Sequence, residues 1–231
     1  MNNLFPSLAD LFIYDIAFLN IVITSLRVSF SAVLIAFLVS IPVGFLLSTK
    51  KFLGRDLTII IINTLMALPP VVIGLILYIL FSNQGIFSYF DLLYSLYIMI
   101  IAQTILITPI LITLSRETID RVRDDYNEFM ISLNLSYFRK MKTLIWETRY
   151  ILITHFLVGF GRALSEVGAI IIVGGNIAYL TRTMTTGIVL ETSRGNLSIA
   201  LKLGITLLLI SLLINILLYY VKNFGESKLI K

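Results

Sequence analysis

The stretch VSFSAVLIAFLVSIPVGFLLST, residues Val28–Thr49, contains no charged side chain and consists mainly of aliphatic and aromatic residues. Coiled as an α-helix it would be about 33 Å long, enough to cross the roughly 30 Å hydrocarbon core of a lipid bilayer. Backbone polar groups in hydrocarbon must be hydrogen-bonded within the segment itself, and a helix satisfies them. This stretch therefore predicts a membrane-spanning helix.

The composition of the whole chain points the same way. Of the 231 residues, 58% are apolar and 13% are charged, and the mean hydropathy is +0.97. Soluble domains have about 45–50% apolar and about 25% charged residues. The surplus of apolar side chains cannot be buried in one core and must face membrane lipid. We expect an all-α polytopic membrane protein that forms a single domain over residues 1–231.

Five apolar segments are long enough to be spans. The apolar run Ile16–Leu26 precedes the first segment and is separated from it only by Arg27, so it is either an interfacial segment or an extension of that span. We place the spans at about residues 20–49, 57–81, 92–115, 150–173 and 203–221.

Basic residues are unevenly shared between the two sides of these spans. Thirteen Lys and Arg residues follow the first, third and fifth spans, and three lie on the other side. The positive-inside rule then places the N-terminus outside and the C-terminus in the cytoplasm, in a bacterial or archaeal cytoplasmic membrane. Met1–Asp15 contains no Lys or Arg, so we do not interpret the first span as a cleavable signal peptide.

The sequence also argues against several function classes. It contains no cysteine and one histidine, His155, so thiolate metal sites and cysteine nucleophiles are excluded and a histidine cluster would have to be built from one residue. We expect no catalytic residue, no metal and no cofactor. The net charge of +5 reflects topology, and we expect no nucleic-acid partner. Gly174-Gly175-Asn176 lacks the Gly-Lys-Ser/Thr ending of a phosphate loop, so ATP would be hydrolysed by another chain.

The long polar segment between the third and fourth spans, residues 116–149, carries an amphipathic pattern. Such a helix can lie among lipid headgroups, or it can dock in a groove on a soluble partner, and its periodicity does not choose between the two. The apolar side chains at helical spacing are Phe129, Met130, Leu133, Tyr137, Met141 and Leu144.

Part of this segment, from Glu128 to Ser136, resembles the EAA motif of ABC importer permeases. Glu128 stands at the glutamate, two apolar residues replace the alanines, and Asn134 replaces the glycine. Asn is the best substitute for glycine if that position needs a left-handed conformation. The resemblance implies a cytoplasmic coupling helix that contacts an ATPase subunit through Glu128, Ser132, Leu133, Asn134, Leu135, Ser136 and Tyr137.

Three further stretches resemble permeases of the molybdate and tungstate type: NTLMALPPVVIGL at residues 63–75, GFGRALSEVGA at 159–169 with VGGNI at 173–177, and TRTMTTGI at 181–188 with Glu191-Thr192. The last is most similar to tungstate permeases. The resemblance implies a type I ABC importer transmembrane domain. It would act as a homodimer with two copies of an ABC ATPase and an extracellular or periplasmic oxyanion-binding protein.

The implied cargo is an oxyanion, for which tungstate fits the resemblance best and molybdate and sulfate are the alternatives. Outside this family, the residues alone also allow a membrane scaffold or sensor, a channel, or a secondary transporter. Inverted repeats would favour a secondary transporter, and the sequence shows none convincingly.

Two polar features inside the predicted spans are candidates for the translocation pathway. Arg162 lies about 18 Å along a helix from Tyr150, near the midplane, and Glu166 follows it by about one helical turn on the same face. The pair either fixes helix packing or lines the pathway or its gate.

The second feature is Pro69-Pro70, which removes two backbone donors and must kink or break the second span. The break is either a packing kink or a hinge or pore constriction. The predicted pathway or gate residues are Pro69, Pro70, Arg162, Ser165, Glu166 and Gly168.

Overall fold

The computed structural model describes residues 16–229, without the side chains of Asn127 and of residues 224–229. No described residue lies in a strand, so the predicted all-α class is confirmed for this part of the chain. Met1–Asp15, on which the prediction that the first span is not a cleavable signal peptide rests, lies outside the described residues. The elements are α2 (Ile16–Thr49), α3 (Arg55–Met66), α4 (Pro70–Phe81), the 3-10 helix η1 (Ser88–Phe90), α5 (Leu96–Ser132), α6 (Tyr137–Leu164), α7 (Gly168–Gly174), α8 (Met184–Ser193) and α9 (Leu197–Leu229).

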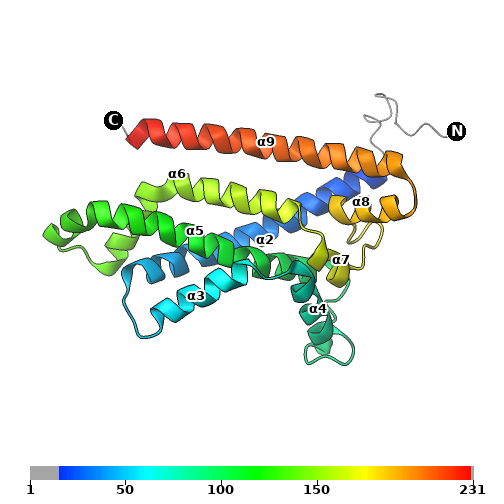
Figure 1. Cartoon of the computed structure of the whole chain (residues 1–231), viewed down its shortest axis with the longest axis horizontal. Coiled ribbons are helices and arrows are strands. Elements are labelled where there is room, and N and C mark those ends of the chain that lie inside the picture. Colours follow the sequence, from blue (N-terminus) through cyan, green and yellow to red (C-terminus); the bar gives the residue numbers. More distant parts are fainter. Residues whose placement is uncertain (1–15, 230–231) are drawn as a thin grey trace.

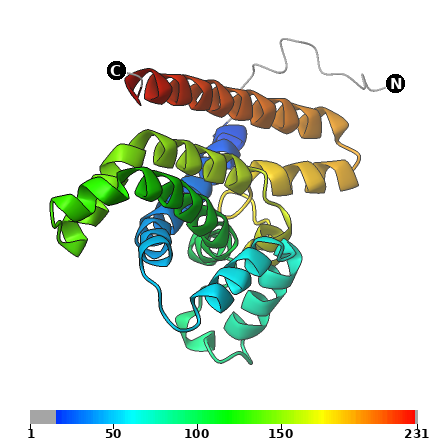
Figure 2. The same ribbon diagram turned by 60° about the vertical axis from the view of Figure 1, so that its left-hand side comes forward.

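Four long helices form the bundle that carries the candidate sites (Figures 1 and 2). α2 packs against α5 and α6, and α6 lies between α5 and α9. Helices α2, α5 and α9 each contain an apolar stretch long enough to cross a membrane, and only 17% of that stretch in α9 is buried. Pro42 in α2 and Pro109 in α5 each remove one helical hydrogen bond, yet both helices continue past them.

The first long helix includes the apolar run Ile16–Leu26. α2 continues without a break to Thr49, about 51 Å in all, so this run lengthens the first helix and is not a separate interfacial segment. Its buried face carries small side chains at helical spacing, including Ser29, Ala32 and Ala36. Such side chains let neighbouring helices approach closely.

Two of the predicted spans are broken. α3 and α4 meet at an angle of 98° at Leu68-Pro69, and α6 and α7 meet at 60°. The break at the two prolines is the one expected from their missing N–H groups, whereas the second break had not been predicted. α3 and α4 are each about 18 Å long, too short to cross a bilayer alone. Residues 16–229 thus contain three candidate spans, or up to five if each bent pair counts as one.

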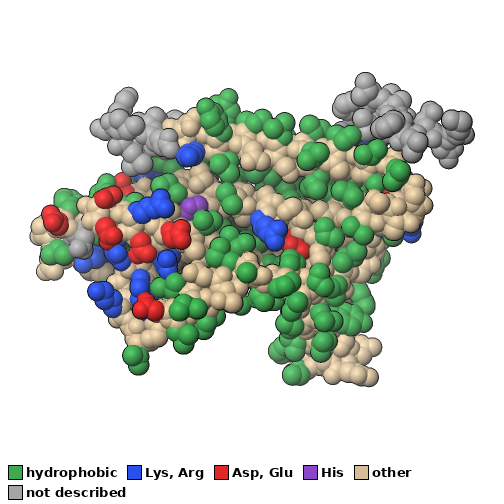
Figure 3. Space-filling view, viewed as in Figure 1, with side chains coloured by type: hydrophobic (Ala, Val, Ile, Leu, Met, Phe, Trp, Pro, Cys, Tyr) green, Lys and Arg blue, Asp and Glu red, His purple; other side chains and the backbone are tan. Residues whose placement is uncertain are grey.

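Charged side chains gather at one end of the molecule, over the end of α5 and the start of α6 (Figure 3). Here the segment 116–149, predicted as a loop containing one helix, is helical throughout except at residues 133–136. α5 extends through this polar region because ion pairs at helical spacing support it, Arg116–Asp120 at 3.6 Å and Asp120–Arg123 at 3.2 Å.

Candidate coupling tip and candidate translocation pathway

The turn between α5 and α6, which we call the coupling tip (residues 128–138), is closed by backbone hydrogen bonds. Asn134 has a φ of 46°, the left-handed conformation that Asn tolerates better than other non-glycine residues. Its N–H donates to the carbonyl of Ile131 (2.9 Å), and the N–H of Leu135 donates to the carbonyl of Met130 (3.2 Å). This pattern ends a helix at a left-handed residue. The apolar spacing over 129–144 therefore belongs to two helices and not to one.

The coupling tip exposes apolar side chains at the charged end of the molecule. Phe129 and Leu133 are 56% and 53% exposed, and Ile131 and Phe138 also lie at the surface. Exposed apolar side chains rimmed by polar ones are typical of a surface that binds a protein partner. The predicted coupling residues that are exposed here are Glu128, Ser132, Leu133, Asn134, Ser136 and Tyr137.

Two of the predicted coupling residues, the half-buried Leu135 and the partly exposed Tyr137, pack against the base of the tip. Leu135 packs against the buried cluster that contains Met130 and Phe45. The ring of Tyr137 meets that of Phe45 edge to face, with centroids 5.2 Å apart. The tip is thus fixed to the end of α2 by side-chain packing, so a force applied to the tip acts on both helices.

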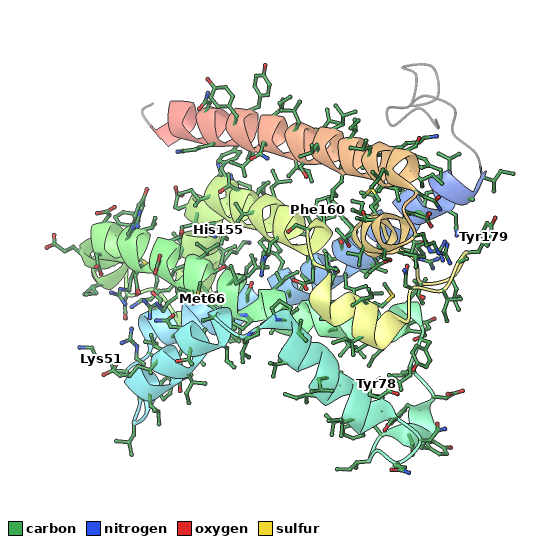
Figure 4. The ribbon with its side chains drawn as sticks, turned by 45° about the vertical axis from the view of Figure 1, so that its right-hand side comes forward. Lys51, Met66, Tyr78, His155, Phe160 and Tyr179 are labelled. Carbon is green, nitrogen blue, oxygen red and sulfur yellow. The ribbon has the colours of Figure 1, made fainter. Side chains whose placement is uncertain are left out.

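The two breaks come together where α4 packs on α7. At Gly168 a Cβ atom would lie 2.8 Å from Cγ2 of Val71 and 3.6 Å from Cβ of Pro70. At Gly74 it would lie 2.9 Å from Cα of Ala169. Only glycine permits this approach, and it places the predicted pathway residues Pro70 and Gly168 side by side. In Figure 4 Met66 ends α3 and Tyr78 lies on α4, on opposite sides of the first break.

Glu166 lies in the second break, after α6 has ended at Leu164. Its Oε1 accepts hydrogen bonds from the N–H groups of Val167 (3.1 Å) and Ala169 (3.4 Å), which a broken helix would otherwise leave unpaired. Its Oε2 lies 4.0 Å from Nη2 of Arg162, the outer limit of an ion pair. The Glu166 side chain is 7% exposed and that of Arg162 is 53% exposed. The carboxylate therefore acts mainly on the backbone, and the guanidinium remains half exposed.

Polar side chains from α5 and α8 also hold the second break, and one from α2 holds the start of α8; sequence reasoning missed these contacts. Buried Gln103 of α5 donates from Nε2 to the carbonyl of Ala163 (2.8 Å), and Thr185 of α8 donates to the carbonyl of Glu166 (2.8 Å). Ser25 of α2 accepts from the N–H of Met184 (2.7 Å). The signal for Gln103 was present, because it is the only amide side chain in the predicted third span. Ser165, also predicted for the pathway, is exposed beside the break.

The threonine-rich stretch 181–188 shapes the connection between α7 and α8. Thr183 caps α8 in a reciprocal pair with Thr186, whose hydroxyl also donates to Oδ1 of Asn176 (3.0 Å). The hydroxyl of Thr181 donates to the carbonyl of Gly174 (2.6 Å). These threonine side chains are buried. In this structure they therefore hold the loop in shape.

His155 is buried in α6, with Nε2 3.4 Å from the hydroxyl of Thr118. Across residues 16–229, no three His, Cys, Asp or Glu side chains come together in a way that could hold a metal ion.

The family model for the inner membrane component of binding-protein-dependent transport systems matches residues 40–223, which include the coupling tip and both breaks. The chain belongs to this family. It is therefore a multi-pass membrane subunit of a transport system, and the resemblance to importer permeases noted in the sequence is confirmed.

Several members of the family are similar over most of their length. The chain is 34% identical to a probable anion ABC transporter permease protein of Haloferax volcanii, over 86% of this chain and 88% of that one. It is 37% identical to the tungstate uptake system permease protein TupB of Campylobacter jejuni, over 71% and 69% of the two chains. Its identity to TupB of Peptoclostridium acidaminophilum is 34%, over 90% and 89%.

Proposed function

We propose that this chain is the membrane-spanning permease subunit of an ATP-driven importer that carries tungstate across the cytoplasmic membrane. The single observation that carries the coupling part of the proposal is the coupling tip, which exposes Phe129, Ile131 and Leu133 on a base fixed to α2. The relatives named for tungstate uptake support the choice of cargo.

In this proposal each tip seats in a cleft of one of two ATPase subunits, which hydrolyse the ATP. α5 then links the tip to the second break, because it runs as one helix from Leu96 to Ser132 and carries Gln103, which is bonded to Ala163 at the end of α6. A displacement of the tip would move α5, and the hydrogen bond between Gln103 and Ala163 would pass this movement to the end of α6 at the break. Alternating access follows if the break and its neighbour α4 change their packing in each cycle.

We further propose that the working unit contains two copies of this chain, with the pathway between them. Within a single chain none of the residues of α3 is buried, and Leu57, Ile60 and Ile61 lie on its surface. A second copy would cover part of this surface and bring the two α3–α4 breaks together. Lipid would cover the remaining apolar surface.

The charges near the second break suit a weak contact with a passing dianion. The half-exposed guanidinium of Arg162 can attract an oxyanion, and the neighbouring carboxylate of Glu166 reduces that attraction. High affinity at this position would slow release. The extracellular or periplasmic binding protein would therefore make the selection.

Uptake by the reconstituted importer tests the proposal. Permease, ATPase and binding protein are placed in liposomes, and tungstate, molybdate and sulfate inside the vesicles are measured by elemental analysis. We expect ATP-dependent accumulation of tungstate above the other two anions. If molybdate or sulfate accumulates in preference, the assignment of tungstate as the cargo is wrong.

The coupling role is tested by Leu133→Asp, with Leu53→Asp as the matched control. Both leucines are exposed, and both precede a helix at the same end of the molecule, but Leu53 lies in the α2–α3 connection outside the tip. We expect Leu133→Asp to lose ATPase co-purification and uptake, and Leu53→Asp to keep both. Equal behaviour of the two variants would contradict the coupling assignment.

A further inference from the structure

A small cavity opens between the end of α2 and the base of the coupling tip. Its volume is about 180 Å³. Phe45, Met130 and Leu144 form an apolar floor, and each is at most 2% exposed. Because these side chains belong to one buried cluster, the floor is fixed. The cavity is therefore part of the packed structure of this end of the molecule.

Basic side chains line the cavity, and no carboxylate does. Arg123 is already neutralised, since it pairs with Asp120 (3.2 Å) and Asp124 (2.7 Å). Lys50 and Lys140 differ from it. Among the side chains that the structure describes, no carboxylate lies within ion-pair distance of either lysine.

The ammonium group of Lys50 is held over the ring of Tyr137, 4.7 Å from its centroid. Lys140 lies in the first turn of α6, where its backbone N–H donates to the carbonyl of Ser136 (2.9 Å). Lys50 and Lys140 thus belong to different helical segments and line the same cavity. Two unpaired ammonium groups beside an apolar floor favour an anion that also has an apolar part.

The surroundings of this cavity are of the kind found at the level of lipid headgroups. The exposed apolar side chains Leu38 and Leu46 follow the surface of α2 toward Lys50. At the same charged end the exposed ring of Trp146 lies under the guanidinium of Arg149, 4.5 Å from its centroid. Tryptophan and basic residues of this kind are typical of the boundary between hydrocarbon and water.

We propose that the cavity binds the phosphate group of an anionic phospholipid, with Lys50 and Lys140 as its cationic partners. The phosphodiester oxygens would lie between the two ammonium groups, and the glycerol region would lie on the apolar floor. Basic pockets between helices at the cytoplasmic side of a membrane bind phosphate headgroups in this way. A bound headgroup would bridge the end of α2 and the start of α6 and so stabilise the tip. The proposed lipid site borders the coupling tip, but its evidence does not rest on the proposed transport function.

Lipid retention by the purified full-length permease tests the proposal without any ATPase or cargo. The protein is reconstituted in nanodiscs of phosphatidylglycerol and phosphatidylcholine, re-extracted in mild detergent, and the co-purifying phospholipid is identified by native mass spectrometry. The pocket variant is Lys50→Gln with Lys140→Gln. The control is Lys51→Gln with Lys142→Gln, which removes the same charge from two exposed lysines that do not line the cavity.

We expect the wild type and the control to retain phosphatidylglycerol over phosphatidylcholine, and the pocket variant to lose about tenfold or more of that preference. Thermal unfolding of all three proteins verifies that they are folded. Equal retention by the pocket variant and the control would overturn the proposal. A second arm adds inorganic phosphate alone. If phosphate raises the thermal unfolding temperature of the wild type and the control but not of the pocket variant, and neither lipid is retained in preference, then the anion is free phosphate and not a lipid headgroup.

Discussion

At the scale of single residues, Asn134 decides where α5 ends. An Asn in place of glycine could be interpreted from the sequence, because few other side chains tolerate a left-handed backbone. The sequence could not tell whether the exposed tip lies on lipid or on a protein. That choice depends on which side chains turn inward. Tyr137 packs on Phe45 while Phe129 and Leu133 stay exposed, and this arrangement supports the proposed contact with a protein.

The stability of Asn134 variants should depend on how well each residue tolerates the left-handed backbone, and not on the chemistry of the side chain. Asn134→Gly relieves a residue held at φ 46°, and Asn134→Val adds a β-branched side chain there. We expect the valine variant to lose about 1–2 kcal/mol of stability relative to the glycine variant and to co-purify less ATPase. Thermal unfolding and pull-down measure both effects. Equal stability of the two variants would show that the turn can adopt another conformation.

Substitutions of Glu166 can distinguish its hydrogen bonds with backbone N–H groups from its ion pair with Arg162. Glu166→Gln keeps an oxygen that can accept from Val167 and Ala169, whereas Glu166→Ala leaves these N–H groups without their partner. We expect the alanine variant to lose about 1–3 kcal/mol and the glutamine variant to stay close to wild type. Denaturation of the purified permease gives the values. A glutamine variant as unstable as the alanine variant would assign the role to the ion pair with Arg162.

At the scale of helices, the sequence predicted one break and missed the other. Pro69 and Pro70 lack backbone N–H groups, so their effect was visible in the sequence. Nothing comparable marks residues 165–167, and the spacing of Arg162 and Glu166 fits an unbroken helix. The second break is maintained by hydrogen bonds from Gln103 of α5 and Thr185 of α8, which lie outside the broken span. Apolar spacing does not predict the polar end of α5, because ion pairs support this part of the helix.

The contact between α4 and α7 should be sensitive to one methyl group. Gly74→Ala would place its Cβ 2.9 Å from Cα of Ala169, so the two helices would have to move apart. Gly161→Ala is the control, because no atom lies within 4 Å of its added Cβ. We expect a loss of about 1–3 kcal/mol for Gly74→Ala and no loss for Gly161→Ala, both from thermal unfolding. Similar stabilities would mean that the two helices are free to separate.

At the scale of the whole molecule, the charge asymmetry predicts an orientation that labelling can measure. Lys51 and Tyr179 lie at opposite ends of the structure (Figure 4). The chain contains no cysteine, so single cysteines can be introduced without background. We expect Tyr179→Cys to react with an impermeant maleimide in intact cells, and Leu53→Cys to react only after the membrane is permeabilised. The reverse pattern would invert the topology inferred from the basic residues.

Pro109 gives α5 a compliant joint between a short arm and a long arm. Its missing hydrogen bond makes it the softest point of the helix, about 9 Å from Gln103 on one side and about 35 Å from Ser132 on the other. Bending at this joint would let the long arm swing while the short arm stays in place. Displacement of the tip would therefore reach Gln103 only while α5 remains straight, so Pro109 limits the force that the tip can pass into the membrane.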